Sequence, residues 1–211
     1  MAMLAALAIA ADMFLRIPGI GGFLTYEPKD VILTIGGFIF GPIAGIVMSL
    51  LVCTLEMLTV SSTGLIGLLM NFLSSAVFVG VGTLIYKKKK TLSGAIIGLI
   101  AASLSMTIIM LLWNYIITPM YMGIPREAVL ELFVPLLIPF NLLKAALNSA
   151  LIMSLYKGVV TALRKSGLVP AGEKSGADGK KANTAVIVTI SAFLVVTLTL
   201  VVLIFAGIIK F

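Results

Sequence analysis

A succession of long uncharged stretches, separated by short polar joints, constrains the fold of this chain more than any other feature. Residues 92–118 carry no charged side chain and would form a helix of ~40 Å, longer than the ~30 Å hydrocarbon core of a bilayer. Only 11% of the residues are charged and the mean hydropathy is +1.22, whereas a soluble domain carries about 25% charged residues. The pattern predicts an all-α, polytopic membrane protein.

The composition excludes several kinds of site. The sequence has no histidine and a single cysteine, Cys53, which excludes disulfides, metal sites built on His or Cys, and hydrolases that need a histidine base. It has no G-x-x-x-x-G-K-[ST] phosphate loop, so the chain cannot hydrolyse ATP by that route. We expect no metal and no cofactor. Most of the net charge of +7 lies in basic joints beside apolar stretches, at 87–90 and 157–181, which favours a lipid membrane over nucleic acid as the partner.

We expect six membrane spans in the first part of the chain. They cover residues 2–17, 30–41, 42–60, 64–86, 92–118 and 139–164. The first has about 15 residues before Arg16 where ~20 are usual, so we expect the natural helix to begin upstream of Met1. The second has about twelve residues, or ~18 Å, before Gly41-Pro42, which predicts a short or bent helix packed among others. Four glycines would permit close helix contacts there: Gly36, Gly37, Gly41 and Gly45.

The chain divides into three parts. Residues 1–165 form the six-helix membrane domain. Residues 166–183 are rich in Gly, Ser and charged side chains, which predicts a flexible cytoplasmic linker. Residues 184–211 are apolar and rich in β-branched side chains, and they predict an additional C-terminal transmembrane helix.

Basic residues set the predicted orientation. Lys87 to Lys90 and the Arg164/Lys165 pair should lie in the cytoplasm. The six-helix domain then begins and ends inside, and the seventh span leaves Lys210 outside. The loops at 17–29, 61–63 and 119–127 face outward.

Polar residues from several segments should meet near the outer face in this topology. Spans one, three and five run outward and spans four and six run inward, so the outer third of the bundle gathers Tyr26, Glu27, Glu56, Asn71, Asn114, Asn141 and Lys144. Amides and one ammonium supply hydrogen-bond donors and acceptors with little net charge. Such a site suits a neutral, planar, polar organic molecule and fits a metal ion or a polyanion poorly.

Lys144 needs the strongest explanation. It shares one helix face with Asn141 and Asn148, because the three residues fall at i, i+3 and i+7. A lysine at the centre of the bilayer costs about 2.5–3.5 kcal/mol, which a wet or polar cavity would offset. Alternatively, Lys144 snorkels to the outer surface or pairs with Glu56.

Other polar residues also have structural interpretations. Glu56 is alternatively a protonated carboxyl bonded inside the bundle, and Asn71 an interhelical hydrogen bond. Asp12 precedes Arg16 by four residues, a spacing that suits an ion pair, and Asp30 is most simply a helix N-cap. Three aromatic side chains are typical of an interfacial belt: Trp113, Tyr115 and Tyr121.

Four segments are informative together: "LTYEPKDV" at 24–31, "EMLTVSSTGLIGLLMN" at 56–71, "LLWNYIITPMYMGIPREAV" at 111–129 and "PFNLLKAALNSAL" at 139–151. They resemble the riboflavin-specific substrate-binding (S) components of energy-coupling factor (ECF) transporters, over residues 1 to about 168. The resemblance implies six spans, no enzymatic activity, and capture of riboflavin outside a prokaryotic plasma membrane. It also implies an ECF module, with a transmembrane T subunit and two ATPase subunits, that carries the vitamin inward.

The resemblance also implies roles for individual residues. It assigns Asn114, Asn141 and Lys144 as hydrogen-bond partners of the flavin ring or ribityl chain. Residues 24–27 become a lid that includes Leu24, Thr25 and Tyr26. Three further residues extend the site, namely Glu56, Asn71 and Asn148. Asn148 lies about two turns below Asn141, where it lines the floor or only packs.

The first helix and the tail are the other two features to explain. Ala2, Ala6 and Ala10 show the A-x-x-x-A spacing with which this family docks on the T subunit; alternatively, these small residues pack inside the chain. The linker and the segment from residue 184 are additions to the usual six spans.

Two other functions are alternatives to the S-component interpretation. A self-sufficient ion-coupled transporter would use Asp12 or Glu56 as its protonating group. An intramembrane enzyme is disfavoured by the missing histidine and by the lack of a paired carboxylate motif. Within the S-component interpretation, one basic residue supports a phosphate poorly, so we expect riboflavin to bind more tightly than flavin mononucleotide (FMN).

Overall fold

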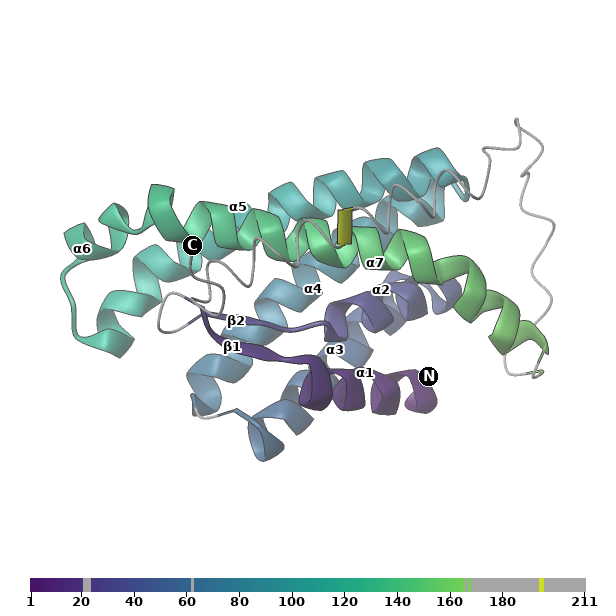
Figure 1. Cartoon of the computed structure of the whole chain (residues 1–211), viewed down its shortest axis with the longest axis horizontal. Coiled ribbons are helices and arrows are strands. Elements are labelled where there is room, and N and C mark those ends of the chain that lie inside the picture. Colours follow the sequence, from purple (N-terminus) through teal and green to yellow (C-terminus); the bar gives the residue numbers. More distant parts are fainter. Residues whose placement is uncertain (21–23, 62, 166, 168–193, 196–211) are drawn as a thin grey trace.

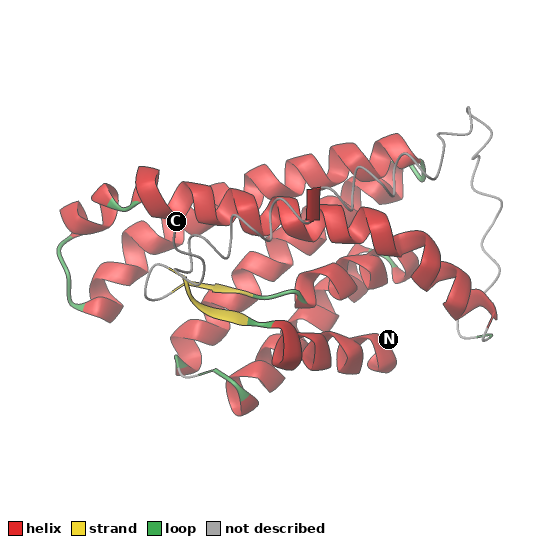
Figure 2. Ribbon diagram, viewed as in Figure 1, coloured by secondary structure: helices red, strands yellow, loops and turns green. Residues whose placement is uncertain are grey.

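The fold is a bundle of helices with one small β-hairpin (Figures 1 and 2). The computed structural model describes residues 1–20, 24–61, 63–165, 167 and 194–195. The helices are α1 (Ala2–Leu15), α2 (Lys29–Phe40), α3 (Pro42–Thr59), α4 (Gly64–Lys88), α5 (Leu92–Met122), α6 (Arg126–Glu131) and α7 (Ile138–Lys165). A π-helical turn, η1 (Phe133–Leu137), leads into α7, and the antiparallel strands β1 (Ile17–Ile20) and β2 (Leu24–Tyr26) join α1 to α2.

The predicted all-α membrane class is confirmed. In the described part of the chain, four helical stretches are long and apolar enough to cross a membrane: Pro42–Thr59, Gly64–Lys88, Ser93–Met122 and Phe133–Tyr156. Helices α1 and α2 are shorter, at 14 and 12 residues. The count of six spans plus one therefore stays a prediction. The predicted linker at 166–183, and the added span apart from residues 194–195, lie outside the described residues.

Elements between the predicted fifth and sixth spans were not foreseen. Helix α5 continues through Pro119 and ends at Gly123, whose φ of 66° is the left-handed conformation that closes many helices. Pro125 then precedes the short helix α6, and η1 follows with Pro135 inside it. The hairpin in the first outer loop was also missed, because its two short strands carry no alternating apolar pattern that would reveal them.

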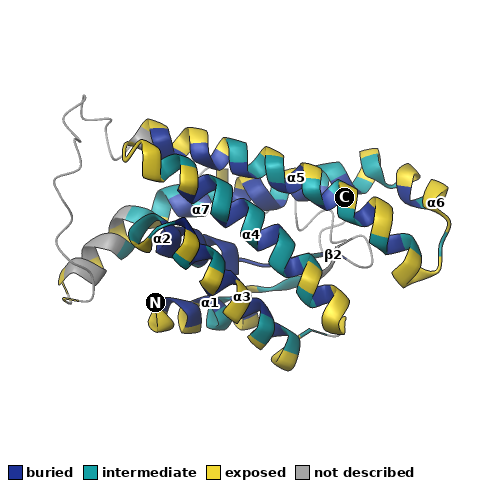
Figure 3. Cartoon of the chain, turned by 180° about the vertical axis from the view of Figure 1, so that it is seen from behind, coloured by how far each residue is buried: buried dark blue, intermediate teal, exposed yellow. Residues whose placement is uncertain are grey.

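Helix α2 is short and buried between its neighbours, as the sequence predicts (Figure 3). A Cβ on Gly37 would meet the Thr83 side chain at 2.5 Å, and one on Gly45 would meet Gly37 Cα at 3.2 Å. These glycines let α2, α3 and α4 approach closely. Gly41 differs from the prediction: nothing lies within 4 Å of its Cβ position, and its φ of 99° instead allows the sharp junction between α2 and α3.

The connections gather at opposite ends of the bundle. The hairpin, α6 and the α3–α4 connection lie at one end, whereas the N-terminus, the α4–α5 connection and the C-terminal end of α7 lie at the other (Figures 1 and 3). The basic residues Lys87 to Lys90 fall at this second end. This separation agrees with the predicted sidedness and places the polar loop segments together.

We expect Gly45→Ala to destabilise the protein by about 1–3 kcal/mol, because the added methyl group overlaps Val79 Cγ1 at 2.7 Å and approaches the backbone of Gly37. The measurement is the temperature at which half of the detergent-purified protein loses its monodisperse peak in size-exclusion chromatography. Gly158→Ala in α7 is the matched control, since nothing lies within 4 Å of that Cβ position. Equal melting temperatures for the two variants would contradict the close α2–α3 contact.

Candidate ligand-binding site

The carboxylate of Glu27 is the centre of a buried polar network. It follows β2, is separated from α2 only by Pro28, and is 2% exposed. Its Oε2 accepts hydrogen bonds from Lys29 Nζ at 2.9 Å and Lys144 Nζ at 3.3 Å. Its Oε1 accepts from Arg16 Nη2 at 3.2 Å and Asn71 Nδ2 at 3.0 Å. One side chain thus connects the loop to α1, α2, α4 and α7.

Glu56 on α3 forms the second centre of this network. Asn71 Nδ2 donates to Glu56 Oε1 at 2.7 Å, and Lys29 Nζ donates to Glu56 Oε2. Arg16 Nη2 lies 3.3 Å from Glu56 Oε1. Asn71 therefore makes an interhelical hydrogen bond, which is the structural alternative foreseen for it, and at the same time reaches the lid through Glu27.

Arg16 connects the end of α1 to this network. Its Nη1 lies 3.9 Å from Asp12 Oδ2, which confirms the ion pair predicted from the i, i+4 spacing. Its Nη2 reaches both Glu27 and Glu56. Because Asp12 is fully buried and Arg16 lies at the edge of the first loop, this arginine ties α1 to the lid.

The cluster balances its charges. Its members are three cationic side chains and three carboxylates: Arg16, Lys29, Lys144, Asp12, Glu27 and Glu56. Removing one partner from a buried ion pair typically costs about 3–5 kcal/mol, because it leaves the other charge without compensation. The balanced set therefore holds five segments in one arrangement, namely α1, the first loop, α2, α3 and α7. It leaves no cation of the cluster without a carboxylate.

Glu27 lies in the loop, outside the predicted spans, and it is ionised at neutral pH. Burial alone raises the pKa of its carboxyl, but Lys29 and Lys144 outweigh burial and hold that pKa well below its ordinary value of 4.5. Because the folded-state pKa is lowered, the stability from ionised Glu27 is fully present above a pH of 4.5 and is lost as the pH falls through the folded-state value.

Lys144 follows neither structural alternative proposed from the sequence. It is 6% exposed, so it does not snorkel, and its partner is Glu27 in the lid rather than Glu56. The interaction crosses 117 residues of sequence. Lys144 consequently joins α7 to the first loop.

The lid has a second connection to α7. Tyr26 Oη donates a hydrogen bond to Asn148 Oδ1 at 3.0 Å, whereas Asn148 Nδ2 has no partner among the described residues. Leu24 and Tyr26 are buried against an apolar cluster that includes Val129, Leu137 and Phe140, while Thr25 is half-buried. Asn148 therefore contacts the lid in this structure, which neither sequence interpretation foresaw.

Asn114 and Asn141 are buried but bond within their own helices. Asn114 Nδ2 donates to Met110 O at 2.7 Å, and Asn114 Oδ1 accepts from Thr118 Oγ1 at 2.9 Å. Asn141 Nδ2 donates to Leu137 O at 2.8 Å. In the described part of the chain, no hydrogen bond joins either amide to the Glu27 network, so a ligand role for these two residues stays a prediction.

Lys29 is the member of this network that sequence reasoning missed. It is fully buried at the first position of α2 and bonds Glu27 and Glu56. The helix dipole destabilises the positive charge of a lysine at a helix N-terminus, which signals that a specific acidic partner must be nearby.

Asp30 is not the N-cap of α2, because Pro28 holds that position. The carboxylate of Asp30 instead accepts a hydrogen bond from Ser75 Oγ at 2.5 Å.

The face of α1 predicted to dock on a partner is open. Ala2 and Ala6 are exposed and Ala10 is half-buried, whereas Leu4, Ala5 and Ala8 pack into the bundle. The alternative that all three alanines pack inside the chain is therefore wrong for Ala2 and Ala6.

In the described residues, no group of three or more Cys, Asp or Glu side chains is arranged to hold a metal ion.

Comparisons with known proteins place this geometry in a family. Residues 1–156 match the family model described as "ECF transporter, substrate-specific component". The riboflavin transporter RibU of Staphylococcus aureus (strain TCH60) is 32% identical over 155 residues, covering 71% of this chain and 82% of the relative. The riboflavin transporter FmnP of Bacillus subtilis (strain 168) is 28% identical over 136 residues, covering 60% and 72%.

A solved structure agrees with the sequence comparisons. The S component of a bacterial ECF transporter superposes with a TM-score of 0.66 at 32% identity, over 77% of this chain and 94% of that one. Four apolar helical stretches of spanning length fit a multi-pass protein of the prokaryotic plasma membrane. A substrate-specific component is a transporter subunit rather than an enzyme, and it works with an energy-coupling module. The chain belongs to the family of substrate-specific components of ECF transporters.

Proposed function

We propose that this chain captures riboflavin from outside the cell and presents it to an ECF module for ATP-driven uptake. Two relatives that are 32% and 28% identical over 155 and 136 aligned residues are riboflavin transporters. The proposed site lies under the hairpin and is bounded by α5 and α7, which carry Asn114, Asn141 and Lys144. Their amide and ammonium groups match the carbonyls and ring nitrogens of a flavin.

The pairing of Lys144 with Glu27 is the observation that carries the choice of an uncharged ligand. The ammonium lies 3.3 Å from a buried carboxylate that also bonds Lys29 and Arg16. A phosphate that entered this site would meet cations already compensated by carboxylates, together with the negative charge of Glu27. A neutral flavin avoids this repulsion and the cost of burying an uncompensated charge.

The lid contacts suggest how the site closes. Tyr26 and Glu27 reach α7 through Asn148 and Lys144, respectively. In the proposed mechanism, opening of the hairpin breaks both contacts and admits the ligand between the lid and α7. Lys144 then donates to a flavin oxygen, and closure restores the contact between Glu27 and the remaining cations.

The proposed docking surface is on α1, whereas the proposed ligand contacts are on α5 and α7. Ala2 and Ala6 leave a smooth face on α1 that permits close approach of a helix of the T subunit. Arg16 at the end of α1 contacts the lid carboxylate Glu27. The same network therefore gives the lid a direct physical connection to the helix that would meet the partner.

The purified chain should bind riboflavin with nanomolar affinity, roughly −12 kcal/mol, and bind FMN more weakly. Quenching of flavin fluorescence during titration in detergent measures both dissociation constants. We expect the preference for riboflavin to reach at least ~10-fold, because the phosphate meets compensated cations. No saturable quenching by riboflavin would refute the proposed ligand, and equal affinities would refute the electrostatic explanation of selectivity.

Replacing Lys144 by Ala should weaken riboflavin binding by about 1.5–3 kcal/mol if its ammonium donates to the ligand. Because Lys144→Ala also removes a partner of Glu27, the same change is made in a Glu27→Gln background, where that charge is absent. A direct contact with riboflavin predicts that the loss persists in this background.

One control variant and one contradicting outcome complete this experiment. Lys88→Ala, at the other end of α4, removes an exposed lysine and should leave the affinity unchanged. If the loss caused by Lys144→Ala disappears in the Glu27→Gln background, Lys144 acts only through the lid and its assignment as a ligand contact is wrong.

Uptake into proteoliposomes should require the energy-coupling module. We expect no accumulation of riboflavin by the chain alone under an imposed proton gradient, and ATP-dependent accumulation when the T and ATPase subunits are included. A module with an inactive ATPase is the control. Gradient-driven accumulation without the module would instead favour the ion-coupled transporter, with Asp12 or Glu56 as the protonating group.

A further inference from the structure

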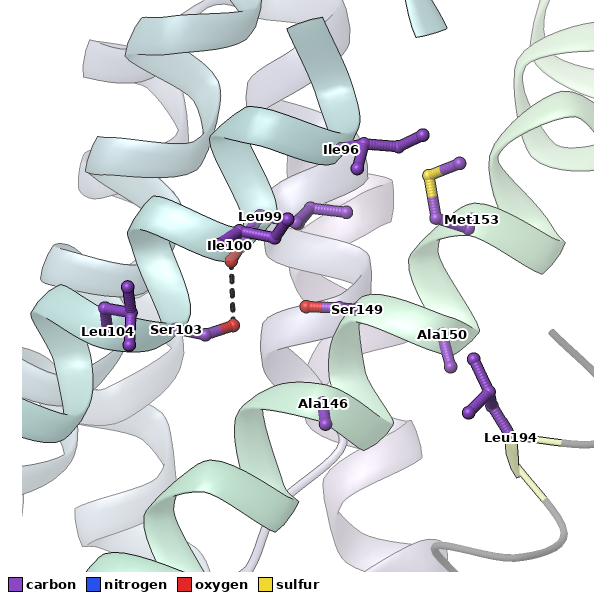
Figure 4. A pocket seen from close by; sticks show the side chains of 10 residues that line it. All are labelled: Ile96, Leu99, Ile100, Ser103, Leu104, Ala146, Ser149, Ala150, Met153 and Leu194. Atoms are coloured by element: carbon purple, nitrogen blue, oxygen red, sulfur yellow. Dashed lines mark hydrogen bonds between the residues drawn. The ribbon is translucent and has the colours of Figure 1, made fainter. Parts of the chain in front are cut away.

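A hollow lies between α5 and α7, and no member of the Glu27 network lines it. Its volume is about 330 Å³ and it is bordered by α5 residues such as Ile100 and Leu104 and by α7 residues such as Ala150 and Met153 (Figure 4). These are apolar side chains, and the exceptions are Ser103 and Ser149. Ser103 Oγ is satisfied by Leu99 O at 2.7 Å, whereas Ser149 Oγ is buried without a partner among the described residues.

One lining residue comes from the other end of the chain. Leu194 lines this hollow together with Met153 and lies beside Ala150 (Figure 4). Its neighbour Val195 packs against the apolar cluster that contains Leu24, Tyr26 and Leu147. Leu194 thus lines the α5–α7 hollow while remaining 44% exposed, and Val195 packs against the adjoining cluster of the hairpin, α6 and α7.

We propose that residues 184–209 cross the membrane as a helix that lies in the groove between α5 and α7, antiparallel to α7. This inference does not depend on the identity of the ligand. As a helix this segment would be ~39 Å long, enough for the ~30 Å hydrocarbon core. The family match ends at residue 156, so this helix is an addition to the matched S-component region.

The depths of the contacting residues agree with this arrangement. Counted at 1.5 Å per residue, Leu194 lies ~15 Å from Thr184, and Met153 lies ~18 Å from Lys165 at the end of α7. On α5, Leu104 lies ~18 Å from its first residue, Leu92. Thr184, Lys165 and Leu92 all lie at helix ends on the predicted cytoplasmic side. Leu194 therefore lies at about the same membrane depth as Met153 and Leu104, which line the hollow.

The linker allows this placement within one chain. Residues 166–183 reach at most ~60 Å when extended and average about 23 Å as a flexible coil. Adjacent packed helices are only about 8–10 Å apart. The segment can therefore return beside α7 without strain, and the high local concentration of a tethered helix favours it over a second copy of the chain.

The segment also carries a partner for the unpaired hydroxyl. Ser191 precedes Leu194 by three residues, so both lie on one face of a helix. In the proposed helix, with Leu194 in the groove, this face would turn Ser191 toward α7, where Ser149 Oγ lacks a partner among the described residues. Ser–Ser hydrogen bonds of this kind join helices in membranes.

Such a helix would fix the spacing of the two helices that carry the proposed ligand contacts. Asn114 is on α5, and Asn141 and Lys144 are on α7. A helix packed along the lipid-facing side of α5 and α7 excludes lipid from the groove and limits the distance between the two helices. The proposed role of the added segment is therefore to brace the ligand-binding pair of helices from the lipid side.

Cysteine cross-linking in the full chain tests this packing. Leu194→Cys is combined with Ala150→Cys, and in a second variant with Met153→Cys, and a protease site is inserted in the linker at 172–177. After oxidation in the membrane and cleavage, a disulfide keeps the C-terminal fragment attached on a non-reducing gel. The natural Cys53 is 1% exposed and therefore inaccessible to the new thiols.

The matched control pairs Leu194→Cys with Leu50→Cys, an exposed residue of α3 that lies ~12 Å from the start of its helix. We expect at least ~5-fold more retained fragment for the α7 pairs, because only they can bring two Cα atoms within disulfide distance. Retention equal to the control would overturn the proposal. Disulfide-linked dimers of the whole chain would overturn it too, by showing that a second copy fills the groove.

Discussion

The buried carboxylate of Glu27 is the interaction on which the rest of the structure depends. It belongs to a loop, yet it binds side chains from α1, α2, α4 and α7. Inside a membrane protein an isolated carboxylate would be strongly opposed by desolvation, so it must gather cations around it. Lys29, Lys144 and Arg16 are those cations, and Glu56 compensates the charge that they add. The position of the lid therefore follows from charge compensation rather than from apolar packing alone.

The packing of the other helices is adapted to the lipid bilayer, in which no hydrophobic driving force brings helices together. Lipid tails are as apolar as leucine side chains, so helices associate through close backbone contact and interhelical hydrogen bonds. Gly37 and Gly45 supply the close contact between α2 and α3, and Ser75 and Asn71 supply hydrogen bonds from α4. Helix α2, too short to cross by itself, is held by these neighbours.

The network and the family membership together explain why a substrate-specific component contains so many buried charges. A substrate-specific component must hold its ligand outside and signal occupancy to a partner that touches another surface. Arg16 and Glu27 join the helix with the exposed alanine face to the lid, and Lys144 joins the lid to α7. In the proposed function, ligand binding at Lys144 alters contacts that reach α1 through two side chains.

The sequence by itself determined the class, the approximate helix bounds and the identity of most buried polar residues. Hydrophobic length and charge distribution suffice for these, because the bilayer demands long apolar helices and allows few buried charges. The resemblance of four short segments also led to the family that the comparisons establish. Asp12 and Arg16 could be paired because a helix fixes the distance between residues four apart.

Only the tertiary structure decided which polar groups meet across distant segments. Lys144 pairs with Glu27 rather than Glu56, Asn148 holds Tyr26, and Lys29 is buried between two carboxylates. Helical periodicity gives the face of a residue but not the rotation and depth of its neighbours, which depend on close contacts such as Gly37 against Gly45. The sequence therefore indicated that Lys144 and Glu56 needed compensation, whereas the packing of the helices decided their partners and brought Lys29 into the same network.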